Sequence, residues 1–185
     1  MADILIIGFR GYGKIQVARE LAHMLHCRFV DLDDVIVDID RPRTGRRQSC
    51  RDIYKQIGAD KFRDLECRAA QHIRDETLPA GADQVVALGG ESWMDEKIRS
   101  ILRPMGTLVY LQGVFTELWE RMERQGVPEH LKSEDAQEQF KALLSERETV
   151  CLQDADVVVN ISGLDTENAA KHVLDELLGG AVKAA

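Results

Sequence analysis

Five short apolar runs recur along the chain, separated by longer segments in which apolar residues follow a helical spacing. The runs cover residues 4–7 (ILII), 28–33 (RFVDLD), 85–88 (VVAL), 107–111 (TLVYL) and 157–161 (VVVNI). The spacing of Val17, Leu21 and Leu25 is typical of the segments between them. Strands that read as continuous apolar runs and alternate with helices indicate a parallel sheet covered on both faces. We therefore predict a three-layer α/β domain.

Two stretches interrupt this alternation. Residues 34–77 read as a helix-rich insertion, and residues 124–133 as a polar loop between two helices. They are candidates for a substrate-binding subdomain and a lid. The small-residue tail 180–185 is expected to fray. A chain of 185 residues is long enough for one sizeable core and short for two, so we expect a single domain spanning 1–185.

Charge and composition narrow the possible functions. A formal net charge of −8 does not favour a nucleic-acid partner. The longest apolar runs are much shorter than a membrane span requires. The four cysteines lie far apart with no C-x-x-C pair, which is typical of reduced thiols rather than of disulfides or a zinc site. We expect a cytoplasmic protein, and a monomer, that binds neither nucleic acid nor membrane.

The first apolar run leads directly into GFRGYGK, residues 8–14, which fits the phosphate-binding template G-x-x-x-x-G-K. Glycines between a strand and a helix let backbone N–H groups surround an anion at the helix N-terminus. Lys14 would then reach the β- and γ-phosphates of a nucleotide. The alternative is an ordinary glycine-containing turn, but the preceding strand and the lysine in register favour phosphate binding.

Ile15 departs from the template, which has Ser or Thr at this position. A hydroxyl there would supply an oxygen ligand to Mg²⁺, and isoleucine has none. A water molecule could take the place of that ligand, although the branched side chain would crowd it. The sequence therefore predicts a nucleotide site whose binding of Mg²⁺ is in doubt.

Asp31 and Asp33 end the second apolar run and are expected to point to the same side, because alternate residues of a strand share a face. Near a bound triphosphate, one carboxylate can hold a metal through water while the other accepts a proton from an alcohol. Alternatively, these residues and Asp34 only cap the next helix.

Further candidates lie later in the chain. Arg63 and Glu66 are spaced i, i+3 on a predicted helix, so that the carboxylate can orient the guanidinium, although surface pairs at this spacing are common. Gly89 and Gly90 follow the third run, where they let backbone approach a ligand. Nothing local distinguishes Arg147 from other helical arginines.

Taken in order, these segments resemble the shikimate kinases, enzymes that transfer the γ-phosphate of ATP to the 3-hydroxyl of shikimate. The resemblance runs almost end to end, through GFRGYGK, RFVDLDD, IYKQIGADKFRDLE, VVALGGE, GTLVYL and LSERETVCLQDADVVVN. It implies a P-loop NTPase-type fold with a five-stranded parallel sheet, a helical substrate-binding insertion after the second strand, and a lid.

The resemblance also implies a role for each matching residue. The ATP site would comprise Gly8, Arg10, Gly11, Tyr12, Gly13, Lys14, Ile15 and, against adenine, Arg121. The shikimate site would comprise Asp33, Arg63, Gly89, Gly90 and Arg147. Asp31 would hold Mg²⁺ through water, and Lys14 and Asp33 would be the catalytic residues.

Four positions depart from the family pattern. Ile15 replaces the magnesium ligand, and Glu91 replaces the third glycine of a G-G-G sequence. Val127 replaces a lid arginine that would stabilise charge on the transferring phosphoryl group, and Cys151 replaces a tyrosine. Three of the four affect the nucleotide, the metal or the transition state, whereas Asp33, Arg63 and Arg147 remain.

The sequence therefore predicts a shikimate kinase-like phosphotransferase with weak or conditional activity, which uses ATP, Mg²⁺ and shikimate or a close relative. Two alternatives stay open. One is a catalytically impaired regulatory protein that binds shikimate or nucleotide on the same fold. The other is a small-molecule kinase with a different acceptor, signalled by Glu91.

Overall fold

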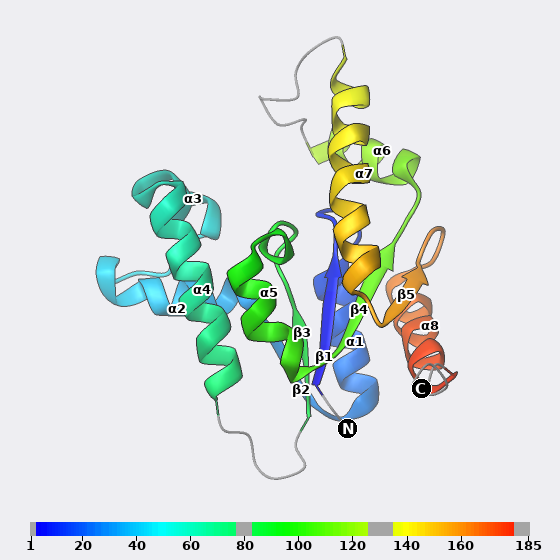
Figure 1. The fold of residues 1–185 in the computed structure, drawn as a ribbon, viewed down its shortest axis with the longest axis horizontal. Helices are drawn as coiled ribbons and strands as arrows, with labels where there is room; N and C mark the ends of the chain where they lie inside the picture. The colour runs from blue at the N-terminus through cyan, green and yellow to red at the C-terminus, as the bar shows by residue number, and fades with distance from the viewer. Residues whose placement is uncertain (1–2, 77–82, 126–134, 180–185) are drawn as a thin grey trace.

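The structure, a computed structural model, describes residues 3–76, 83–125 and 135–179. Its centre is a five-stranded parallel sheet with helices on both sides, as predicted (Figure 1). The strands are β1 (Asp3–Gly8), β2 (Arg28–Asp31), β3 (Gln84–Ala87), β4 (Gly106–Gln112) and β5 (Val157–Asn160). They lie in the order β2-β3-β1-β4-β5, so the first strand of the chain is the middle strand of the sheet.

The helices pack on this sheet through their apolar faces. They are α1 (Lys14–Leu25), α2 (Leu32–Thr44), α3 (Cys50–Ile57), α4 (Ala59–Asp75), α5 (Glu96–Leu102), α6 (Phe115–Gln125), α7 (Ala136–Asp154) and α8 (Thr166–Gly179), with short 3-10 helices η1 (Ser92–Met94) and η2 (Arg103–Met105). Within the described ranges, none is both long and apolar enough to cross a membrane.

The middle strand explains why continuous apolar runs predict this sheet. Residues Ile4 to Ile7 are all buried, since β1 has a strand on each side and helices on each face. Leu5 is paired with Val86 of β3 and with Leu108 of β4. Side chains on both faces of β1 are therefore removed from water, which is the main stabilising contribution of such a strand.

The second strand ends two residues earlier than the sequence predicts. The expectation that Asp31 and Asp33 share a strand face is wrong, because α2 begins at Leu32 and places Asp33 in its first turn. The cause is local: the Asp31 carboxylate accepts a hydrogen bond from the Asp33 backbone N–H at 3.0 Å and caps the helix. The capping alternative therefore applies to Asp31.

The stretch 34–77 contains most of α2 together with α3 and α4, which extend to one side of the sheet in Figure 1. Residue 124, where the predicted lid begins, still belongs to α6. Gln125 also belongs to α6, whereas the rest of the predicted lid, 126–133, which includes Val127, and the tail 180–185 lie outside the described residues.

Candidate active site

The loop between β1 and α1 has the backbone geometry of a phosphate cradle. Gly13 precedes α1 with φ 74°, a left-handed conformation that favours glycine. A Cβ at Gly8 would lie 2.8 Å from the Leu111 carbonyl oxygen of β4, so this position admits no side chain without movement. The loop thus turns tightly and leads into the N-terminus of a twelve-residue helix, which attracts anions.

Lys14 begins that helix and is buried, with 7% of its surface exposed. Its Nζ donates a hydrogen bond to the Phe9 carbonyl oxygen at 3.1 Å, inside the loop. Burial lowers its pKa to about 8, an effect that the negative charges of Asp33 and Asp31 partly oppose. A phosphate group in the loop would restore the stability of the ammonium form, which suits Lys14 to anion binding.

Two contacts hold the loop from outside. The Tyr12 hydroxyl donates a hydrogen bond to the Gly113 carbonyl oxygen at 2.8 Å, and burial raises its pKa to about 12. The Arg121 guanidinium, from α6, donates to the Gly11 carbonyl oxygen at 2.7 Å. The resemblance implied adenine as the partner of Arg121; in this structure the side chain contacts the loop backbone.

Ile15 lies on the first turn of α1 with 37% of its surface exposed. The position that carries a hydroxyl in the template therefore presents an apolar side chain to solvent. Among the described residues there is no group of three His, Cys, Asp or Glu side chains that could hold a metal ion. Mg²⁺ is commonly bound by one or two carboxylates together with substrate phosphates and water, and Asp31 is the carboxylate that the family resemblance implies for such a site.

Asp31 and Asp33 lie at the carboxyl end of β2, beside the loop. Burial, together with the neighbouring charges of Asp33 and Asp34, raises the pKa of Asp31 to about 6, although the hydrogen bond from the Asp33 backbone N–H lowers it in part. Burial also raises the pKa of Asp33, while the Lys14 ammonium lowers it. A carboxylate whose pKa lies above its ordinary value is a better proton acceptor.

Replacing Asp31 with asparagine is expected to stabilise the fold at pH 7. A folded pKa of about 6 against an ordinary 3.8 means that the charged carboxylate destabilises the protein above pH 6, and that this penalty disappears below 3.8. Because this half-buried carboxyl is screened by solvent, the penalty is roughly 1 kcal/mol, less than the roughly 3 kcal/mol that the full pKa difference represents, and asparagine keeps the helix cap. Denaturant unfolding of the wild type and of Asp31→Asn at pH 7 and pH 4 measures this penalty. Equal stability of the two proteins at pH 7 would contradict the expectation.

Gly89 lies beside both Asp33 and Ser92, and Ser92 is linked through Glu66 to Arg63. A Cβ at Gly89 would lie 3.3 Å from Asp33 Oδ1 and 2.5 Å from Ser92 Oγ, so the missing side chain keeps this approach open. The Ser92 hydroxyl donates to Glu66 Oε1 at 2.7 Å, and Glu66 Oε2 accepts from Arg63 at 2.7 Å. Burial raises the pKa of Glu66. The pair spaced i, i+3 in the sequence is thus an anchored one rather than a surface pair.

The turn after β3 also contacts the loop and α7. A Cβ at Gly90 would lie 3.2 Å from the Arg10 backbone nitrogen, so the two loops pack together. Next to it, Glu91 forms an ion pair with Arg147 at 3.0 Å. Cys151, one turn further along α7, is buried, which raises the pKa of its thiol to about 11.

Sequence reasoning missed several of these contacts. Ser92 was not singled out, although it follows Glu91 directly and fixes Glu66. Cys50, whose thiol donates to the Asp33 carbonyl oxygen at 3.4 Å, was noted only as a free thiol. The pairing of Glu91 with Arg147 had no local signal, since the two residues lie on segments far apart in the chain.

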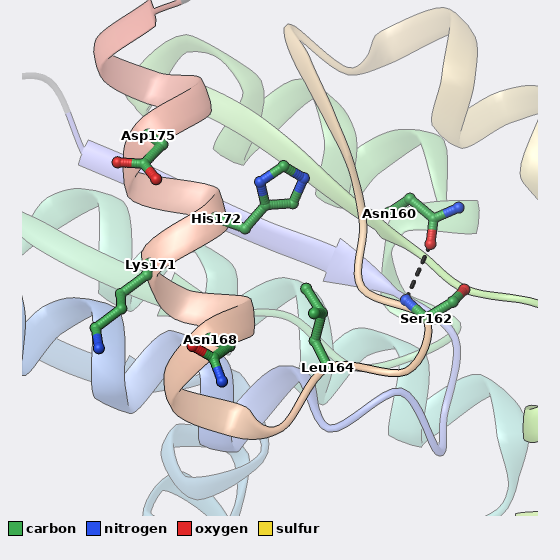
Figure 2. A pocket seen from close by; sticks show the side chains of 7 residues that line it. All are labelled: Asn160, Ser162, Leu164, Asn168, Lys171, His172 and Asp175. Atoms are coloured by element: carbon green, nitrogen blue, oxygen red, sulfur yellow. Dashed lines mark hydrogen bonds between the residues drawn. The ribbon is translucent and has the colours of Figure 1, made fainter.

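A surface hollow lies at the carboxyl end of β5. Figure 2 shows it between the end of β5, the loop that follows and α8. It is lined by Asn160, Ser162, Leu164, Asn168, Lys171, His172 and Asp175. None of the predicted site residues belongs to it, and it is a feature separate from the phosphate loop.

The loop, its buried lysine and the adjacent acidic and arginine side chains together define a P-loop protein of the kinase type, on a parallel sheet whose middle strand leads into the loop. The family model of shikimate kinase matches residues 10–178. A shikimate kinase of Chlamydia pneumoniae is 32% identical over 173 residues, which cover 94% of this chain and 93% of the relative. The chain belongs to the shikimate kinase family.

Other relatives support the same family and the same fold. A shikimate kinase of Geobacter metallireducens is 30% identical over 178 residues, covering 96% of this chain and 92% of the relative. Among solved structures, a shikimate kinase from Acinetobacter baumannii in complex with shikimate matches with a TM-score of 0.80 at 24% identity, over 99% of this chain and 96% of that one. The shikimate kinase of Aquifex aeolicus matches with a TM-score of 0.73, also at 24% identity. These two structures confirm the fold.

Proposed function

We propose that this protein transfers the γ-phosphate of ATP to the 3-hydroxyl of shikimate or a close relative, at a reduced rate. The observation that carries the proposal is the buried Lys14 in a glycine-rich loop, with Asp33 close enough for its charge to raise the pKa of Lys14, together with Arg63, which Glu66 and Ser92 hold in place. Membership of the shikimate kinase family supports the choice of substrates.

Each group has a defined task in this reaction. The loop N–H groups and Lys14 bind the ATP phosphates, and Arg63 and Arg147 bind the acceptor carboxylate. The acceptor hydroxyl oxygen forms a bond to the γ-phosphorus while the bond to the β,γ-bridging oxygen breaks, and Asp33 accepts the hydroxyl proton. Mg²⁺, when bound, is held by Asp31 through water and neutralises charge on the phosphates.

Two residues are the reason that we expect a reduced rate. Ile15 presents no oxygen to the metal, and Val127, outside the described residues, supplies no positive charge to the transferring group. Loss of an arginine of that kind costs about a thousandfold or more in rate.

A coupled ADP-release assay with ATP, Mg²⁺ and shikimate tests the proposal. We expect shikimate-dependent turnover well below the roughly 10 per second of an ordinary enzyme. A rate near that value would contradict the reduced activity. Binding of shikimate without turnover would favour a regulatory protein, and turnover of another polyol acid in place of shikimate would favour a different acceptor.

Replacing Ile15 with serine is expected to raise the rate by at least about tenfold, since even groups that only support a metal ligand contribute 10- to 100-fold. The gain should be accompanied by tighter binding of Mg²⁺ in the presence of ATP. Kinetic titration with Mg²⁺ measures both, with Ile15→Val as a control that changes size but adds no oxygen. If rate and Mg²⁺ affinity are unchanged in Ile15→Ser, the metal argument is wrong.

Replacing Arg63 or Arg147 with alanine is expected to weaken shikimate binding by roughly 1.5 to 3 kcal/mol each, the contribution of charge-assisted hydrogen bonds. ATP binding should be unchanged, because neither arginine belongs to the loop. Isothermal titration with each ligand measures the two effects. Arg68→Ala, an exposed arginine of α4 with no ion pair among the described residues, is the matched control. Full-strength shikimate binding in both variants would show that the acceptor site lies elsewhere.

A further inference from the structure

Both arginines of the proposed acceptor site already contact protein carboxylates, but their contacts differ in kind. Arg63 pairs with Glu66 and Asp95, whereas Arg147 pairs with Glu91. Glu66 is 6% exposed and also accepts a hydrogen bond from Ser92. Such an anchored carboxylate orients the guanidinium and stays in place.

Arg147 pairs with a carboxylate that lacks this anchoring. The Glu91 side chain is 66% exposed, whereas that of Arg147 is 23% exposed. No hydrogen bond from another described residue holds the Glu91 carboxylate. It can therefore leave the arginine at small cost, because the carboxylate is already largely exposed to water.

A side-chain carboxylate and the carboxylate of an acceptor are the same chemical group to an arginine. Glu91 follows Gly90, which packs against the phosphate loop, so this carboxylate is held next to the proposed acceptor site. An acceptor that uses Arg147 must first displace Glu91, and it then places a second negative charge near the first.

We propose that Glu91 is a specificity-determining residue that competes with the carboxylate of the acceptor for Arg147. This inference rests on the proposed function. Its consequence is a site that binds carboxylate-bearing acceptors less tightly, and distinguishes them less sharply from carboxylate-free acceptors, than a site with glycine at this position would.

The test is calorimetric binding of shikimate and of its methyl ester to the whole protein and to Glu91→Gln. An exposed ion pair contributes up to about 1 kcal/mol, so the variant is expected to bind shikimate roughly two- to fivefold more tightly. Its affinity for the neutral ester should not change. Glu146→Gln removes an exposed charge next to Arg147 that has no ion pair among the described residues, and is expected to change neither affinity.

Salt provides a second readout. In the wild type one carboxylate replaces another at Arg147, so affinity should depend weakly on salt. In Glu91→Gln a new ion pair forms on binding, so affinity should fall more steeply as salt screens it. A merely structural role for Glu91 would not change this slope.

Each outcome decides the inference. Tighter binding of shikimate alone, with a steeper salt dependence, supports it. If the wild type binds shikimate but Glu91→Gln binds it no more tightly, or if shikimate and ester gain equally, the inference is wrong and the proposed function stands. If neither protein binds shikimate, the inference and the proposed function both fail.

Discussion

Replacing Lys14 with alanine is expected to abolish detectable ATP binding and to lower phosphoryl transfer by at least about a thousandfold, while shikimate binding survives. Lys14 is the buried cation of the loop, and burial makes a single charge contact much stronger than it would be in water. Arg63 and Arg147 lie on other helices and do not depend on it. Titration with ATP and with shikimate, each alone, separates the two sites.

Two further variants make this result specific. Lys14→Met keeps most of the buried volume and should lose ATP binding to the same degree, which excludes a packing defect as the cause. Lys171→Ala removes an exposed lysine of α8, paired with Glu167, and should bind ATP normally. A wild type that does not bind ATP at all would remove the premise and favour a role without nucleotide.

Replacing Asp33 with asparagine is expected to lower the rate of transfer by about 100- to 10,000-fold, the range for loss of a positioned general base. Asparagine keeps the shape but cannot accept the hydroxyl proton. ATP binding should persist at pH 7, where Lys14, with a pKa of about 8, remains mostly protonated. Removing the Asp33 charge lowers the pKa of Lys14 further. ATP binding by the variant and by the wild type should therefore be compared at or below neutral pH.

The adjacent Asp34 is the matched control for this experiment. It is exposed and pairs with Arg47. Asp34→Asn should keep the wild-type rate. Loss of less than about tenfold in Asp33→Asn would show that Asp33 orients the acceptor hydroxyl without taking its proton.

The fold could be predicted from the sequence because its main signals are local and redundant. Buried parallel strands require apolar side chains on both faces, so the inner strands β1, β3 and β4 appear as continuous apolar runs. The edge strands β2 and β5 are less buried, but each still carries enough apolar residues to be recognised. The end of β2 could not be placed by the same rule. RFVDLD reads as one run, but the helix cap at Asp31 overrides it and begins α2 at Leu32.

The sequence alone could predict the site only where its functional residues belong to one continuous segment. The phosphate loop is contiguous, and the structure gives it the geometry that its glycines predict. Contacts between distant segments, such as Ser92 with Glu66 and Glu91 with Arg147, depend on how helices pack against the end of the sheet. The sequence shows that Glu91 departs from the family pattern, but only the structure shows that it pairs with Arg147.

The order of the sheet strands bears on how the chain is made. β1 leaves the ribosome first, yet its two neighbours are β3 and β4, and β4 begins only at Gly106. At about 5 to 20 residues per second, roughly 5 to 20 seconds pass before both are available. Until β3 is synthesised, the apolar residues Ile4 to Ile7 have no neighbouring strand, and until β4 is synthesised they have only one. Because unpaired apolar strands favour aggregation, the nascent chain is expected to need protection by chaperones until β4 is complete.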